Sequence, residues 1–223
     1  MSGHGVAPPA GRGPLPLARE GYPLIITTAA AGVVCALLGW ASLATAAFAA
    51  CAFCLLFFRD PERSIPADPS TILAPADGRV IKVAAVTDER FLGGPATLVS
   101  IFMSPLDVHI NRAPISGRVI DIRYTAGKYF RAFADKASLD NEQNAVVLED
   151  PQGRRMCVVQ IAGFLARRIV CHLQIGMAIE RGHRYGLIMF GSRADIFLPP
   201  AARVRVQVGD RARGGQTVLA EWA

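Results

Sequence analysis

The stretch "PADGRVIKV" (75–83) returns later in the chain as "PISGRVIDI" (114–122), so the sequence contains a short internal repeat. In both copies a glycine leads into β-branched residues, which predicts a tight turn that feeds a β-strand. Duplicated turns of this kind are typical of hammerhead and barrel-sandwich folds. The copies differ before the glycine, where Asp77 stands in one and Ser116 in the other. Either residue can cap the turn, so the repeat alone leaves a functional role for Asp77 open.

The chain from Arg59 onward shows the same pattern of short strand-like runs between turn residues. Short apolar runs alternate with Gly, Pro and Asp, for example "ATLVSIFM" (96–103) and "RMCVVQIAG" (155–163). These runs predict a β-rich domain with few helices over residues 59–223. Only "GFLARRIVCHLQIGM" (163–177) is compatible with a helix as well as a strand. Residues 1–23 are rich in Gly and Pro, which predicts a disordered tail.

Residues 24–58 contain no charged side chain. A single helix of that length would run about 50 Å, whereas the hydrocarbon core of a bilayer is about 30 Å thick. We therefore expect a helical hairpin that breaks near "GWAS" (39–42) and either spans or re-enters the membrane. Arginines flank the segment on both sides: Arg12, Arg19, Arg59 and Arg63. The positive-inside rule then predicts that both ends of this segment lie in the cytoplasm, with the β-rich domain on the cytoplasmic face of the inner cell membrane.

Composition excludes several classes of protein. The 24 Lys and Arg residues and 18 Asp and Glu residues give a net charge of +6. They are interspersed, which argues against a nucleic-acid-binding tail and is compatible with an anionic substrate or membrane surface. No zinc-binding, dinucleotide-binding or P-loop motif occurs in the β-rich part, so we expect no metal and no external cofactor. Its two cysteines, Cys157 and Cys171, provide no disulfide framework.

Two segments contain residues suited to catalysis. His109 lies in "MSPLDVHINRAP" (103–114), and a Gly191-Ser192 pair interrupts the apolar run "LIMFGSRADIFLP" (187–199). With Asp77 as orienting group and Ser192 as nucleophile, His109 could complete a base–nucleophile set. The residues alone leave three alternatives open: a turn in a membrane-anchored β-barrel adaptor, a membrane-tethered serine hydrolase, or a site of chemistry on the chain itself.

Six blocks in order carry a resemblance to a known family. They are "FFRDPER" (57–63), "APADGRV" (74–80), "FMSPLDVHINRAP" (102–114), "DKASLDNEQN" (135–144), "QIAGFLARRIV" (160–170) and "GLIMFGSRADIFLP" (186–199). Together they resemble the short bacterial and archaeal form of the phosphatidylserine decarboxylase proenzymes. The resemblance extends from Leu24 over nearly the whole remaining chain.

The resemblance implies a self-processing enzyme. Ser192 would attack the carbonyl of Gly191 and split the precursor into a β chain (1–191) and an α chain (192–223). Ser192 would end as a pyruvoyl group, a built-in pyruvate cofactor that forms a Schiff base with the amine of phosphatidylserine. The products would be phosphatidylethanolamine and carbon dioxide. The two chains would form a heterodimer, while homo-oligomerisation and an ether-linked, archaetidylserine-type substrate stay open.

The resemblance also assigns roles by position. Asp77 matches the family's A-D-G block, and His109 matches the histidine of its D-x-H block. Longer members have a second histidine three residues later, where this chain has Arg112, so the division of proton transfers is left open. Anionic headgroups are expected to meet basic residues: Arg167 and Arg168, with Arg203, Arg205, Arg211 and Arg213.

Overall fold

The computed structural model describes residues 15–127, 141–163, 168–189 and 192–223. It divides into two compact units, a helical unit within residues 11–62 and a β domain over Arg63–Ala223. Strands dominate the domain, and an apolar helical hairpin precedes it. The predicted fold class is therefore confirmed.

The helical unit consists of a short 3-10 turn, η1 (Arg19–Gly21), followed by α1 (Tyr22–Leu37) and α2 (Ala41–Phe57). Gly39 permits the connecting turn because its φ of +73° lies in the left-handed region. Among the described helices, the stretch Arg19–Leu37 is long and apolar enough to cross a membrane, whereas α2 is shorter. The hairpin therefore has the composition of a membrane-associated segment.

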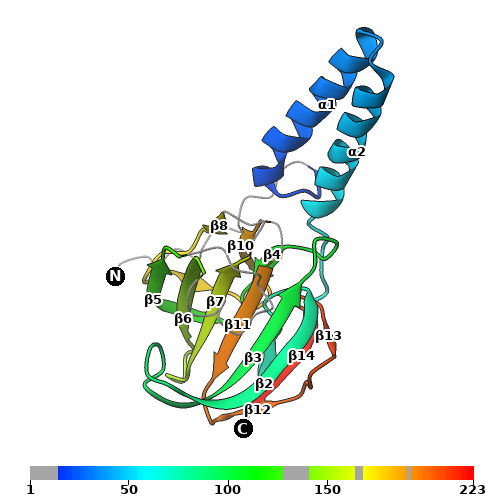
Figure 1. Cartoon of the computed structure of the whole chain (residues 1–223). Helices are drawn as coiled ribbons and strands as arrows, with labels where there is room; N and C mark the ends of the chain where they lie inside the picture. Colours follow the sequence, from blue (N-terminus) through cyan, green and yellow to red (C-terminus); the bar gives the residue numbers. More distant parts are fainter. Residues whose placement is uncertain (1–14, 128–140, 164–167, 190–191) are drawn as a thin grey trace. The chain divides into compact units, whose positions relative to one another are not determined.

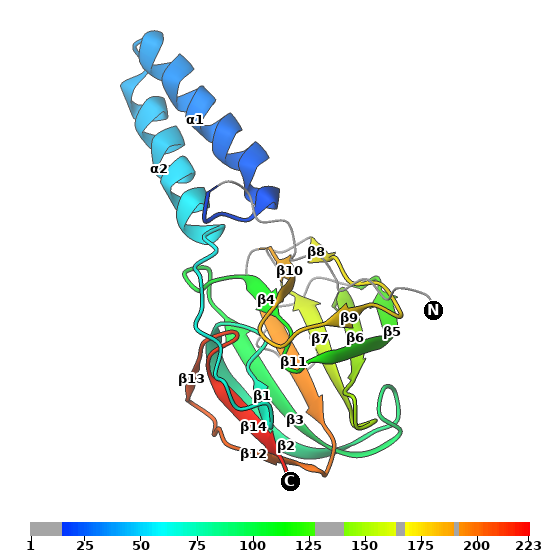
Figure 2. The same ribbon diagram turned by 180° about the vertical axis from the view of Figure 1, so that it is seen from behind.

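One large antiparallel sheet organises the β domain (Figures 1 and 2). Its strands lie in the order β13 (Arg211–Ala212), β2 (Gly78–Asp88), β3 (Gly94–Met103), β11 (Ser192–Leu198), β7 (Arg155–Ala162), β6 (Gln143–Glu149), β5 (Gly117–Thr125) and β9 (Ala178–Ile179). Two small sheets accompany it. One is ordered β4 (Ile110–Arg112), β10 (Arg184–Ile188), β8 (Ile169–Cys171), and the other β1 (Thr71–Leu73), β14 (Val218–Trp222), β12 (Ala202–Val204).

The large sheet is buried on both faces. On one face Ile196 of β11 and Val158 of β7 join the main core, to which all three sheets contribute. On the other face Phe197 and Val159 form a second cluster, against which Phe91 from the β2–β3 connection packs. Burial on both faces explains why apolar residues follow one another without alternation in most of β7 and in the second half of β11, Ile196–Leu198.

The internal repeat forms two equivalent strand starts. A Cβ on Gly78 would lie 2.1 Å from the Phe102 carbonyl oxygen, and a Cβ on Gly117 would lie 2.3 Å from that of Glu149. Each glycine therefore lets a neighbouring strand approach closely. Each copy then has a bulge at the same place in the repeat, after Val80 in β2 and after Val119 in β5. The duplicated sequence thus builds the two halves of the sheet in the same way.

The ambiguous segment 163–177 resolves as strand and turn where it is described. Ile169–Cys171 forms β8, which pairs with β10, and residues 172–177 form a loop. A helix is therefore the wrong reading of this part. The edge position of β8 explains the difference, because β10 supplies hydrogen bonds that the local sequence does not specify.

Candidate active site

Ser192 is the first residue of β11 and is fully buried. It pairs with Met103 of β3 on one side and with Ala162 of β7 on the other. Its Oγ lies 3.4 Å from the carbonyl oxygen of Ile188, to which it donates. The small cluster around this strand end is apolar and comprises Ala76, Met103, Ile188 and Ala194. The sequence thus places a hydroxyl in a dry, firmly held position; Gly191 lies outside the described residues.

His109 is also buried and directly precedes β4. Its Nδ1 lies 3.0 Å from the carbonyl oxygen of Asp107. Because a carbonyl can only accept, Nδ1 must carry the hydrogen, and Nε2 of the neutral ring then holds the lone pair of a base. The backbone links His109 to the serine: Ile188 N donates to the His109 carbonyl at 3.4 Å. Ile188 therefore contacts both His109 and Ser192.

The loop that carries His109 is fixed by the side chain of Asp107. Its Oδ2 accepts hydrogen bonds from the backbone N–H and the hydroxyl of Ser104, both at 2.8 Å. Its Oδ1 accepts from Arg211 Nη2 at 2.9 Å. Arg211, expected from the sequence to meet a lipid headgroup, thus pairs with the carboxylate next to the histidine. Sequence reasoning did not single out the contact between His109 Nδ1 and the Asp107 carbonyl, because a backbone carbonyl has no sequence signature.

Asp77 caps the turn of the first repeat copy and also forms an ion pair. Its Oδ1 accepts from Gly214 N at 2.8 Å, just as the hydroxyl of Ser116 accepts from Arg181 N at 3.0 Å in the second copy. The second oxygen distinguishes Asp77, since Oδ2 forms an ion pair with Arg63 at 2.8 Å. Within the part of the chain that the structure describes, no hydrogen bond joins Asp77 to His109.

The basic residues expected at the substrate site occupy different places. Arg168 is exposed, and its carbonyl accepts from Met189 N at 3.1 Å, close in sequence to Ser192. Arg167 lies outside the described residues. Arg112, which stands where longer members have a second histidine, is buried, and its Nη1 donates to the Gly182 carbonyl at 3.1 Å. Arg203 belongs to β12, which follows the end of β11 remote from Ser192 (Figure 1).

Sequence reasoning did not foresee a buried ion pair directly after the serine. Arg193 and Asp195 are both almost fully buried and form two hydrogen bonds, at 2.6 and 2.9 Å. Ser100 accepts a third from Arg193 at 3.0 Å. The signal was present in "SRADIFLP" (192–199), where two charges stand at alternate positions in an apolar strand. They point away from the Ser192 face because successive side chains alternate.

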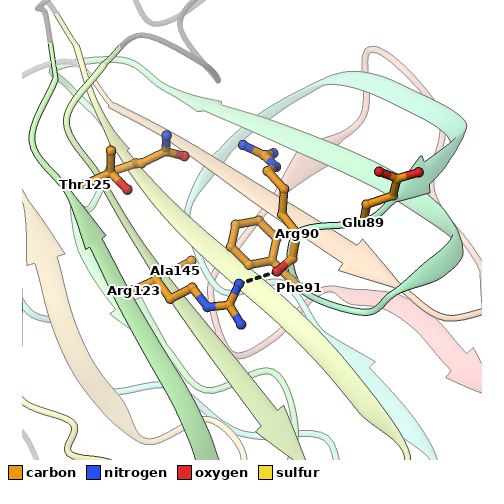
Figure 3. A pocket seen from close by; sticks show the side chains of 7 residues that line it. Glu89, Arg90, Phe91, Arg123, Thr125 and Ala145 are labelled. Carbon is orange, nitrogen blue, oxygen red and sulfur yellow. Dashed lines mark hydrogen bonds between the residues drawn. The ribbon is translucent and has the colours of Figure 1, made fainter.

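A separate pocket of about 260 Å³ involves the β2–β3 connection and strands β5 and β6 (Figure 3). Arg123 donates there to the carbonyl of Arg90, and Phe91 lies beside them. The pocket contains none of the candidate catalytic residues. Among the described residues, no group of three or more His, Cys, Asp or Glu side chains is arranged to hold a metal ion.

Comparison with known proteins identifies the chain. The family model described as phosphatidylserine decarboxylase matches residues 50–220. The chain is 48% identical over 204 residues to the phosphatidylserine decarboxylase proenzyme of Syntrophotalea carbinolica, covering 92% of this chain and 95% of the relative. It is 49% identical over 210 residues to that of Citrifermentans bemidjiense, with the same coverage. The protein is therefore an enzyme of the decarboxylase class. More narrowly, it belongs to the phosphatidylserine decarboxylase family.

Proposed function

We propose that the chain is a self-processing, pyruvoyl-dependent decarboxylase that converts phosphatidylserine into phosphatidylethanolamine and carbon dioxide. The observation that carries this proposal is the position of Ser192. A fully buried hydroxyl at the start of a central strand is poorly placed to meet a soluble substrate of a hydrolase. It is well placed to react with its own chain, and the relatives are named as proenzymes.

The residues of the site provide for the first step. His109 Nε2 takes the proton of the Ser192 hydroxyl, while Oγ bonds to the carbonyl carbon of Gly191. The bond from that carbon to the Ser192 nitrogen then breaks, and the nitrogen receives a proton, so the peptide becomes an ester. Removal of the Ser192 α-proton expels the Gly191 carboxylate and separates residues 1–191 from 192–223. Water then replaces the nitrogen of the new N-terminus and releases ammonia.

The buried surroundings of Ser192 fit the group that results. A pyruvoyl group at this position would supply a carbonyl that can condense with the substrate amine and accept the electron pair left by carbon dioxide. The apolar neighbours Ala76, Met103 and Ile188 exclude water from this position. His109, held by the Asp107 carbonyl, carries the proton that replaces the lost carboxylate. In this proposal Asp77 steadies the strand start beside the site through Arg63 and Gly214.

The apolar hairpin supports a lipid substrate. A lipid with two acyl chains stays in the bilayer, so an enzyme that acts on its headgroup benefits from an anchor at the same surface. The helices α1 and α2 provide an uncharged stretch for that purpose. We place the enzyme at the inner cell membrane, with the β domain on the cytoplasmic face. Arg168, which is exposed close to the site, and Arg167 are proposed to meet the lipid phosphate.

The test uses the purified full-length chain in detergent. Denaturing electrophoresis is expected to show two fragments, and Ser192→Ala should remain a single, inactive chain because it lacks the attacking hydroxyl. Asp77→Asn retains an oxygen for Gly214 and should still be cleaved. A wild-type chain that decarboxylates phosphatidylserine while remaining intact would refute the pyruvoyl mechanism. Activity towards an ether-linked serine lipid, measured in parallel, defines the range of substrates.

A further inference from the structure

Three buried amide side chains form a chain of hydrogen bonds beside the active site. Asn144 Nδ2 donates to Gln160 Oε1 at 3.0 Å, and Gln160 Nε2 donates to Asn111 Oδ1 at 2.8 Å. Gln160 Nε2 also lies 3.4 Å from the carbonyl oxygen of Val170. Because that carbonyl can only accept, the Gln160 amide has a fixed orientation. Asn111 must therefore present its oxygen to Gln160 and direct Nδ2 elsewhere.

At the end of this series of amide hydrogen bonds, Asn111 Nδ2 is a donor without a partner. The residue is fully buried, and no acceptor in the described parts of the chain lies within hydrogen-bonding distance of Nδ2. A buried donor without a partner costs about 1–3 kcal/mol and calls for a functional explanation. Gln160 shows the contrast, since its Oε1 and its Nε2 are both hydrogen-bonded.

The position of Asn111 connects this donor with the catalytic residues. Asn111 lies in β4, two residues after His109, and the His109 carbonyl accepts from Ile188 N of the neighbouring strand β10. Its partner Gln160 is paired with Ala194, which follows Ser192 by two residues on the same face of β11. The unused donor thus lies in the layer between β4 and the large sheet, on the face of the sheet that presents Ser192.

We propose that Asn111 Nδ2 donates a hydrogen bond to the α-carboxylate of the serine lipid. This inference rests on the proposed function and names the group that recognises the carboxylate. A neutral amide can orient the carboxylate without the strong stabilisation that a cation would give it, and that stabilisation would oppose the loss of carbon dioxide. Arg112, the neighbouring cation on β4, donates to the Gly182 carbonyl instead.

The test compares three variants of the full-length enzyme. Asn111→Asp keeps an oxygen for Gln160 but replaces the Nδ2 donor with an oxygen that repels a carboxylate. Asn111→Ala removes both atoms. Asn144→Ala is the matched control, because it removes a buried amide from the far end of the same chain and leaves the Asn111 donor in place.

Three readouts separate recognition from structure. Appearance of the α chain reports folding and self-cleavage. Initial rates on phosphatidylserine in detergent micelles give kcat and KM. Phosphatidylethanolamine, which has no carboxylate, is captured on the α chain by cyanoborohydride reduction and measured by mass, which reports access of an amine lipid to the site.

We expect both Asn111 variants to be cleaved, to lose about 10- to 100-fold in kcat/KM on phosphatidylserine, and to capture phosphatidylethanolamine as the wild type does. Asn144→Ala should affect the two lipids equally. Equal losses on both lipids, no loss on either, or blocked self-cleavage in both Asn111 variants would overturn the assignment. A wild-type chain without cleavage would instead refute the proposed function itself.

Discussion

The buried pair Arg193–Asp195 offers a quantitative test of how the strand that presents Ser192 is held. Replacing Asp195 with Asn keeps the shape of the side chain but removes its charge. In the wild-type chain the Arg193 guanidinium donates hydrogen bonds to Asp195 and Ser100. In the variant it stays buried without a counter-ion. Removing one partner of a buried ion pair costs about 3–5 kcal/mol, because the remaining charge is not compensated.

This free energy converts into a large shift of the melting temperature. An unfolding entropy of roughly 2.1 cal/mol/K per residue over the β domain of residues 63–223 gives about 0.3 kcal/mol per degree. We therefore expect Asp195→Asn to lower the melting temperature by roughly 10 °C. Replacing both charges, as in Arg193→Met with Asp195→Leu, should restore most of the stability because no unpaired charge remains.

The assay is thermal unfolding of the full-length chain in detergent, with Ser192→Ala in every variant so that all remain uncleaved. The control is Glu149→Gln, which breaks the ion pair between Glu149 and Arg155. Because these side chains are 31% and 60% exposed, respectively, the substitution should cost no more than about 1 kcal/mol. If Asp195→Asn melts within the error of that control, or if the two charge removals are additive, the buried pair does not hold β11 as argued.

Three further predictions concern other parts of the domain. His109→Gln should slow self-cleavage at least about 100-fold without unfolding the chain, because the base is lost. Gel time courses measure the cleavage rate, and a normal rate would exclude His109 as the base. Gly78→Ala should destabilise the domain by more than about 3 kcal/mol, because its Cβ would collide with the Phe102 carbonyl. Gly93→Ala, whose Cβ meets open space, should cost about 1–2 kcal/mol. Equal melting temperatures of the two variants would contradict the close approach of β3 to Gly78. Burial raises the pKa of Cys157, so stability should fall above roughly pH 8.5, where the unfolded thiol ionises. Cys157→Ala should reduce this loss in pH-dependent melting, and an unchanged slope would contradict it.

The repeat shows how far the fold could be predicted from the sequence. Two copies of a glycine followed by β-branched residues sufficed to place the starts of β2 and β5, because local turn geometry and strand preference agree there. The bulges after Val80 and Val119 and the pairing with β13 and β9 were not predictable. They depend on strands that come from remote parts of the chain.

The site was predictable to a different degree at each residue. Ser192 and His109 could be singled out because both stand in the ordered blocks that resemble the family, "GLIMFGSRADIFLP" and "FMSPLDVHINRAP". The bonds of Asp77 could not, since Gly214, which donates to its carboxylate, lies 137 residues away. Asn111 was overlooked for a physical reason: only the fixed orientation of Gln160 shows that its donor is unused.

The most direct test of self-processing is the intact mass of the purified wild-type chain under denaturing conditions. We predict an α chain of residues 192–223 of about 3.4 kDa, in proportion to 23.8 kDa for 223 residues. Its mass should be lower than that of the same peptide beginning with serine by one ammonia, and its N-terminus should react with carbonyl reagents. A single chain of full mass in an active preparation, or a fragment with a free serine N-terminus, would contradict the proposal.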